Sequence, residues 1–146
     1  MGVRADTISR REELYREALA VIARDYADDL TVEAVAHAIA TSRRQLQRVL
    51  DEVGEASFRQ ILTQVRMRHA SRMLRETDLS VALVAHRVGY RQAAQFAKTF
   101  RRLYGQPPSV YRSSPQPVAA APNPLGVAAR PGRGAFDGLV AAAPVR

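Results

Sequence analysis

A segment of ten residues occurs twice in this chain, 49 positions apart. Residues 30–39 read LTVEAVAHAI and residues 79–88 read LSVALVAHRV, so five of the ten positions are identical and the alignment needs no gap. In each copy a hydroxyl residue precedes apolar residues at helical spacing, which is typical of a short capped helix. A tight break and a longer helical pattern with Arg, Gln or Lys on its outer side follow each copy. The chain is therefore predicted to fold around two copies of one helical hairpin.

Apolar periodicity and capping signals place further helices around the two copies. Ser42 with Gln45, and Ser57 with Gln60, have the spacing of a capping box at a helix start. The seven predicted helices have the approximate bounds 10–28, 31–39, 42–54, 57–77, 80–88, 91–105 and 109–112. No segment shows the alternation that a half-buried strand requires, so the predicted fold class is all-α.

A short helix, a break and a longer polar-faced helix together form a helix-turn-helix unit. Its second helix enters the major groove of DNA with its N-terminal residues nearest the bases. Two units that read successive groove segments need recognition helices about 34 Å apart, and the helix predicted over 57–77 would supply a linker of about 30 Å. The alternative is a plain helical bundle made from a duplicated hairpin, with its Arg side chains as a solvated face.

The positive charge lies on the part of the chain that carries the repeat. The formal net charge is +8, yet residues 1–30 carry a net −2. Residues 31–112 contain fourteen basic and six acidic residues, and residues 79–112 contain six basic residues and no acidic one. Such a surface attracts the phosphate backbone of nucleic acid, although an acidic protein partner would also fit it. This concentration of charge favours a DNA-binding protein over the plain bundle.

The composition also excludes several classes of site. The chain has no cysteine, and His37, His69 and His86 are too scattered for a metal site. No carboxylate pair, activated nucleophile or Gly-rich phosphate loop indicates an enzyme, and no cofactor is expected. No apolar run reaches roughly eighteen residues and no signal-peptide core is present, so the protein is expected in the cytoplasm, associated with the nucleoid.

The chain is predicted to have one ordered region and two loose ends. Residues 1–9 are predicted to be a flexible lead-in. Residues 10–112 hold the predicted helices, with the first helix-turn-helix unit at about 31–54 and the second at about 80–105. Residues 113–146 contain six Pro, four Gly and nine Ala, and are predicted to be a disordered tail.

Several motifs together make the chain similar to one family. They are SRRQLQR at 42–48, RMRHASRML at 66–74, DLS at 78–80, VGY at 88–90 and GQPPSVYR at 105–112. With these motifs the chain resembles the DNA-binding domain of AraC/XylS-type transcription regulators over residues 14–112. The resemblance implies a seven-helix, homeodomain-like fold in which a long linker helix joins two helix-turn-helix units. It also implies binding to promoter DNA and control of transcription.

The first predicted recognition helix carries polar residues opposite its apolar ones. Its predicted base contacts are Arg43, Arg44, Gln47 and Arg48. Arg can bind guanine, and Gln adenine, through two hydrogen bonds each. The resemblance places Arg44, Gln47 and Arg48 at positions where the family contacts bases. Ser42, the predicted N-cap, is expected to contact a phosphate.

The second predicted recognition helix offers fewer hydrogen-bonding side chains. Its predicted base contacts are Arg91, Gln92, Gln95 and Lys98, and the predicted phosphate contacts are Arg101, Arg102 and Arg112. Alanines at 93, 94 and 97 stand where many family members carry polar side chains, and alanine donates no hydrogen bond. The first unit is therefore expected to supply most of the sequence readout, and the second to contribute mainly phosphate contacts.

Ala40 departs from the family pattern, which usually has Gly in the first turn. If this turn requires a positive φ, Ala40 costs about 1 kcal/mol; otherwise the turn has another shape. Gly54 and Gly105 are the predicted stops of the two recognition helices.

The expected partner is double-stranded promoter DNA, which a chain with two units is expected to bind as a monomer. RNA polymerase is a second candidate partner. The alternative function is an adaptor that binds RNA polymerase or another regulator and contacts DNA weakly.

Overall fold

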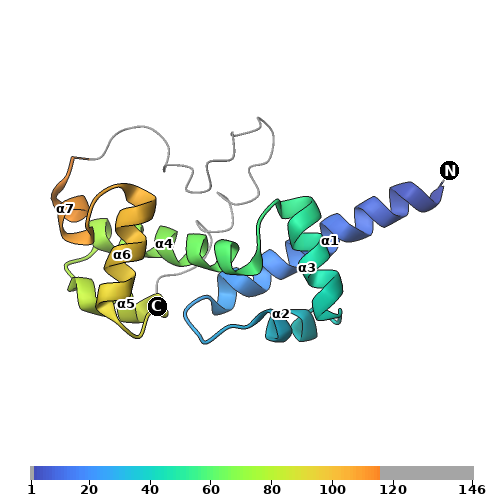
Figure 1. Cartoon of the computed structure of the whole chain (residues 1–146), viewed down its shortest axis with the longest axis horizontal. Helices are drawn as coiled ribbons and strands as arrows, with labels where there is room; N and C mark the ends of the chain where they lie inside the picture. The colour runs from blue at the N-terminus through green and yellow to red at the C-terminus, as the bar shows by residue number, and fades with distance from the viewer. Residues whose placement is uncertain (1, 116–146) are drawn as a thin grey trace. The chain divides into compact units, whose positions relative to one another are not determined.

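The computed structural model describes residues 2–115, and this part of the chain is helical without any strand (Figure 1). Residues 2–115 contain seven helices: α1 (Gly2–Asp25), α2 (Val32–Ala38), α3 (Arg43–Gly54), α4 (Phe58–Glu76), α5 (Val81–Arg87), α6 (Ala93–Tyr104) and α7 (Pro108–Ser113). The predicted all-α class and seven helices are confirmed. Nearly all of the tail predicted over 113–146 lies outside the described residues. None of the described helices is long and apolar enough to span a membrane.

The described residues form two compact units, and the boundary between them falls inside α4, after Val65. The first unit contains α1, α2, α3 and the start of α4. The second contains the rest of α4 with α5, α6 and α7. Each copy of the repeat therefore lies in a unit of its own.

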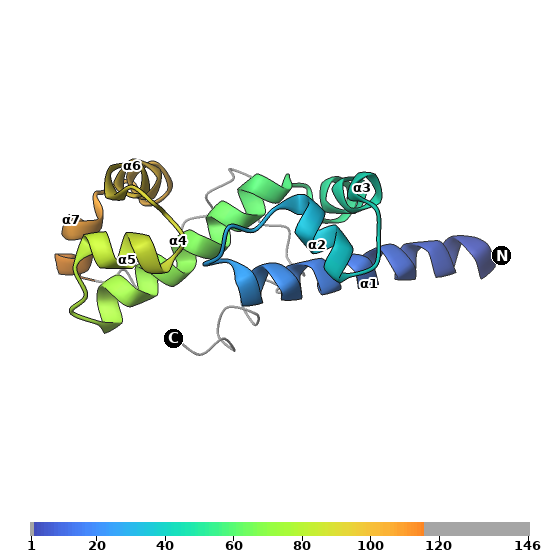
Figure 2. The same cartoon turned by 90° about the horizontal axis from the view of Figure 1, so that it is seen from below.

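The core of the first unit is aliphatic. Helices α2 and α3 pack on one side of α1 and against each other (Figure 2). The side chains that close this core are Leu14, Ile22, Val35, Leu46 and Leu50, none more than 2% exposed. Burial of these apolar side chains fixes α3 on the unit and leaves its opposite face in solvent.

Helix α1 starts at Gly2, whereas the sequence predicts a flexible lead-in over residues 1–9. Residues 4–10 are all exposed, so this part of the helix has no buried stripe that a periodicity search could find. Once a packed segment has nucleated a helix, each added residue gains a hydrogen bond without a new nucleation cost. The packed part of α1 after Leu14 can thus extend the helix back to Gly2.

The core of the second unit combines aliphatic side chains with buried aromatic ones. Phe96 and Phe100 are fully buried on α6, and the Phe100 ring stacks on Tyr104 with 4.5 Å between centroids. Tyr111 of α7 meets Phe100 edge-on at 5.1 Å, and the Arg75 guanidinium lies 4.1 Å from the centre of the Tyr111 ring. These contacts hold α7 on α6 and α4.

Side-chain caps start the helices where the sequence predicts them. Thr31 Oγ1 accepts the Ala34 N–H at 3.1 Å and begins α2. Ser80 Oγ accepts the Leu83 N–H at 3.1 Å and begins α5. The full reciprocal capping box forms before α4: the backbone N–H of Ser57 donates to the Gln60 side chain at 2.8 Å, and that of Gln60 donates to Ser57 Oγ at 3.3 Å.

The turns that follow α2 and α5 have the same hydrogen bonds but different residues. After α2, the Ala40 N–H donates to His37 O at 3.1 Å and the Thr41 N–H to Ala36 O at 2.9 Å. After α5, Gly89 and Tyr90 make the corresponding bonds at 3.1 and 2.9 Å. Both turns are Schellman motifs, which place one residue in the left-handed region. Ala40 has φ 53° and Gly89 has φ 93°, so the first turn does require a positive φ from an alanine.

Helix α3 ends at Gly54, as the sequence predicts, but Gly54 is not the left-handed residue of the cap. It is the last residue of the helix, and Glu55 adopts the left-handed conformation after it, with φ 53°. A Cβ atom at position 54 would lie only 2.7 Å from Cε2 of Tyr15, so the glycine allows close packing of α3 on α1. The prediction for Gly105 is confirmed, because it ends α6 with φ 75°.

Candidate nucleic-acid interface

The outer face of α3 collects the first group of predicted DNA-contacting residues. One side of α3 is buried in the core through the side chains of Leu46, Val49 and Leu50. The exposed side chains on the remaining surface include Arg43, Arg44, Gln47 and Arg48. The N-cap residue Ser42 accepts the Gln45 N–H at 3.1 Å through its hydroxyl oxygen, which leaves the hydroxyl proton for another acceptor. The three arginines and Gln47 therefore present three guanidinium groups and one amide group to solvent, beside the capped N-terminus of the helix.

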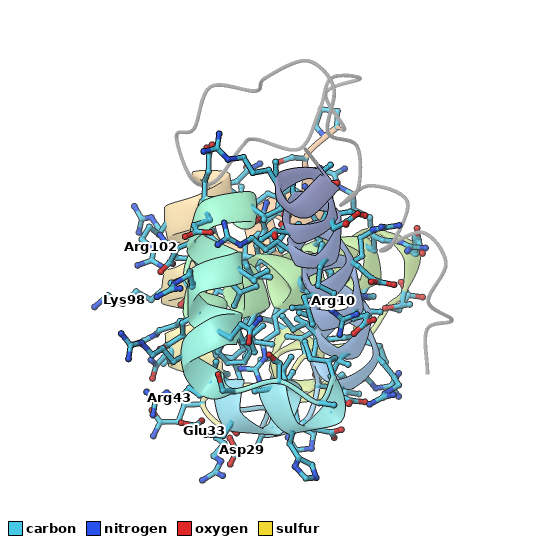
Figure 3. All side chains as sticks on the ribbon, turned by 90° about the vertical axis from the view of Figure 1, so that its right-hand side faces the viewer. Arg10, Asp29, Glu33, Arg43, Lys98 and Arg102 are labelled. Atoms are coloured by element: carbon cyan, nitrogen blue, oxygen red, sulfur yellow. The ribbon has the colours of Figure 1, made fainter. Side chains whose placement is uncertain are left out.

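Arg43 differs from its neighbours because it is already paired. Its Nη1 lies 2.7 Å from Oε1 of Glu33 on α2, and Figure 3 shows the two side chains together. The pair links the two helices of the first helix-turn-helix. No feature of the sequence alone predicted it, since the two residues lie on different helices.

The second break is one residue longer than the first. Four residues separate α2 from α3, and five separate α5 from α6. The short helices therefore correspond at a spacing of 49, but the recognition helices correspond at a spacing of 50. The buried residues support this equivalence, because Leu46 and Leu50 match Phe96 and Phe100.

This equivalence adds one residue to the candidate interface. Gln45 matches Gln95, and Arg48 matches Lys98, and all four side chains are exposed. The sequence assigned Gln45 only to the capping box before α3. The spacing of 50 between the two apolar cores is the signal that would have placed it on the outer face.

The basic residues lie at opposite ends of the two recognition helices. Helix α3 starts with Arg43 and Arg44 and has Asp51 and Glu52 in its later part. Helix α6 starts with two alanines and carries Arg101 and Arg102 in its last turn. Figure 3 shows Lys98 and Arg102 projecting outward from α6. Anions are thus attracted to the N-terminal end of α3 and to the C-terminal half of α6.

Arg91 and Gln92 lie in the break before α6 and not on the helix itself. The sequence predicted a helix start near them, whereas α6 begins at Ala93. Gln92 is the N-cap residue, yet its side chain makes no capping hydrogen bond. Both side chains are exposed beside the start of α6, so the structure keeps them among the candidates.

Arg112, a predicted phosphate contact, makes hydrogen bonds within its own unit. Its Nε donates to Leu74 O at 3.0 Å, and its Nη2 donates to Leu79 O. These carbonyl groups belong to the end of α4 and to the loop before α5. The guanidinium therefore holds α7 against these two segments of the second unit. Two of its five N–H donors are used internally and the side chain is only partly exposed, so Arg112 has a structural role, and its phosphate contact stays a prediction.

The histidines do not form a site. His37 and His86 occupy equivalent exposed positions in the last turns of α2 and α5. His69 is buried in α4, and this burial, assisted by the charge of Arg72, lowers its pKa below the ordinary value of 6.5. Within residues 2–115 no group of three His, Cys, Asp or Glu side chains could hold a metal ion.

Known proteins are similar to this chain in sequence and in fold. A family profile described as "Helix-turn-helix domain" matches residues 35–114. The Escherichia coli (strain K12) protein "Uncharacterized HTH-type transcriptional regulator YijO" is 33% identical over 112 residues, covering 77% of this chain and 40% of that protein. A "Putative AraC-like transcription regulator" of Streptomyces lividans is 37% identical over 99 residues, covering 67% and 32%.

A solved structure extends the likeness to a protein on DNA. It is the DNA-binding domain of AdpA, a global transcriptional factor, in complex with a target DNA. The TM-score is 0.63 with 31% sequence identity, covering 66% of this chain and 87% of that domain. By contrast, the chain spans only 40% and 32% of the two curated relatives' own length, so the likeness concerns one part of those proteins.

Proposed function

The chain belongs to the AraC/XylS-type family of helix-turn-helix transcription regulators, and from this membership we propose that it binds promoter DNA sequence-specifically and regulates transcription. The observation that carries the proposal is the outer face of α3. There a capped helix fixed by three buried apolar residues presents Arg44, Gln47 and Arg48 to solvent. These side chains have the donors and acceptors that discriminate base edges in the major groove.

In this proposal the first unit reads most of the sequence. Its recognition helix brings charge and forked donors to its N-terminal end, which is the end that approaches the bases in a helix-turn-helix. Gln45 joins the predicted base contacts because it matches Gln95. Each well-placed bidentate contact is worth about 1–3 kcal/mol of discrimination.

The second unit acts mainly as an anchor on the phosphate backbone. The alanines at the start of α6 can only make apolar contacts, so fewer bases can be read there. Arg101 and Arg102 in the last turn of α6 supply the charge for phosphates. Gln95 and Lys98 remain candidate base contacts, with Arg91 and Gln92 beside the start of the helix.

One chain is proposed to occupy two successive groove segments as a monomer. Both helix-turn-helix pairs, α2–α3 and α5–α6, lie within the region predicted as the DNA-binding domain, residues 10–112, and α4 lies between them in the chain. A continuous helix of 19 residues is about 28 Å long. That length is close to the 34 Å or so between equivalent groove positions one helical turn apart.

The same proposal assigns no catalytic role and no cofactor, and it locates the protein in the cytoplasm with the DNA. RNA polymerase is proposed as a further partner at the promoters it binds. An adaptor with weak DNA contact is the competing function, and it makes a different prediction about salt.

The test combines selection with a salt titration. Duplexes selected from a random library by the purified chain should share one sequence, and the affinity for that sequence should exceed the affinity for a scrambled duplex by about 10³-fold or more. The logarithm of the association constant should fall linearly with the logarithm of salt concentration, by about 0.9 per phosphate contacted. An adaptor would select no common sequence and would show a shallow salt dependence.

A further inference from the structure

An exposed ion pair joins the two helices of the first helix-turn-helix. Glu33 is the second residue of α2, and Arg43 is the first residue of α3. The carboxylate and guanidinium are 2.7 Å apart, while the two side chains are 55% and 60% exposed. Ion pairs as exposed as this one contribute little to folding stability. Folding therefore does not explain why a carboxylate is held against an arginine at the candidate interface.

The second unit lacks both partners of this pair. The position equivalent to Glu33 on α5 is Ala82, and the position equivalent to Arg43 on α6 is Ala93. Both alanines are exposed, so neither fills a gap in the core. Carboxylate and guanidinium are thus present together in the unit proposed to read sequence and absent together from the unit proposed to hold the backbone.

An unrestrained arginine at this place would bind phosphates of any sequence. Phosphate contacts supply essentially all of the sequence-independent affinity for DNA. A carboxylate accepts the same charge-assisted hydrogen bonds from a guanidinium that a phosphate accepts, so Glu33 competes with the backbone for Arg43. Glu33 also restricts the flexible side chain of Arg43 to one position before DNA binds.

We propose that Glu33 is a specificity-determining positioning residue, which withholds Arg43 from the phosphate backbone and keeps it available for base edges. The inference rests on the proposed DNA-binding function, and it adds a control over which DNA groups Arg43 on the outer face of α3 can contact. It has a direct consequence: Glu33 lowers the affinity for arbitrary DNA more than the affinity for the preferred site.

The test is the variant Glu33→Gln, with Glu13→Gln as its matched control. Glu13 forms an exposed ion pair with Arg10 on α1, at 3.0 Å and with side chains 53% and 59% exposed, so the control removes the same charge from a similar pair. Figure 3 shows Arg10 on α1, on a different helix from the Glu33–Arg43 pair. Affinities are measured over a range of salt for the selected duplex and for a scrambled one.

We expect Glu33→Gln to raise the affinity for the scrambled duplex roughly threefold and to steepen its salt dependence by about 0.9, as one added phosphate contact does. The ratio of selected to scrambled affinity should fall by a similar factor. Glu13→Gln should leave that ratio unchanged. In an Arg43→Ala background, Glu33→Gln should have no further effect on the ratio.

Two results would overturn the inference. One is an unchanged ratio and salt slope in Glu33→Gln, with its thermal unfolding intact. The other is a change that persists in the Arg43→Ala background, since Glu33 would then repel phosphates by itself. If the wild-type chain prefers no sequence, the proposed function fails, but the salt slope on the scrambled duplex still tests the restraint of Arg43. A transplanted pair is the positive control: Ala93→Arg should raise the scrambled affinity, and adding Ala82→Glu should reverse the rise.

Discussion

Replacing Ala40 with glycine should stabilise the protein, although it removes a methyl group and adds no contact. Ala40 has φ 53° in the turn between α2 and α3, and its side chain is exposed. The left-handed conformation costs an L-residue about 1–2 kcal/mol. Glycine avoids this cost but has more freedom in the unfolded chain, which offsets about 0.4–1 kcal/mol. The net gain for Ala40→Gly is therefore about 0.5–1 kcal/mol.

The equivalent turn provides the reciprocal experiment. Gly89 makes the same hydrogen bonds in the second unit with φ 93°, so Gly89→Ala should lower the free energy of unfolding by about 1 kcal/mol or more. Far-UV circular dichroism during thermal unfolding measures both changes. A gain of 0.5–1 kcal/mol corresponds to a rise in Tm of roughly 2–8 °C. Hydrogen exchange of the α2 and α5 amides assigns each change to its unit.

Strain at Ala40 would be excluded by an Ala40→Gly variant that is unchanged or less stable while Gly89→Ala is destabilised. That result would mean that the first turn accommodates its alanine without strain. The double variant should be close to the wild type in stability, because the two turns lie in different units and their effects should add.

Three further predictions concern other parts of the chain. Glu55→Gly should raise the free energy of unfolding by up to about 1 kcal/mol in urea titrations, because Glu55 caps α3 with φ 53°, and an unchanged midpoint would contradict this. Because burial lowers the pKa of His69 in the folded state, the unfolded state binds the proton first, so stability should be lost as the pH falls below about 6.5. The Tm of His69→Leu should vary less than that of the wild type between about pH 7 and pH 5; equal slopes would exclude His69 as the cause. Arg101→Ala and Arg102→Ala should each reduce the salt slope of DNA binding by about 0.9 while leaving sequence preference intact, whereas a shifted preference would make them base contacts.

Local signals account for most of what could be predicted. The caps Thr31, Ser57 and Ser80 act on N–H groups three residues away, so their effect can be read directly from the sequence. The apolar stripe of α3 likewise predicts which face is buried. The family pattern, which usually has Gly in the first turn, pointed to Ala40, but the sequence left open whether its φ is positive.

The features that were missed depend on contacts between distant residues. The internal hydrogen bonds of Arg112 could not be predicted, because their acceptors are 38 and 33 residues away in the chain. Glu33 and Arg43 meet only after the turn has brought α2 and α3 together. The sequence repeat aligns the short helices at a spacing of 49, so it does not reveal the additional residue before α6. For this reason the equivalence of Gln45 and Gln95 was also missed.

In the proposed function the first unit reads most of the sequence and the second mainly holds the backbone. The most direct measurement is the binding of a complete site library by Arg48→Ala and by Gln95→Ala, each compared with the wild type at one salt concentration. Arg48→Ala should relax the preference at its base pair, with a cost of about 1–3 kcal/mol at the best site. Gln95→Ala should change the preference less. A larger loss of specificity in Gln95→Ala would contradict the account.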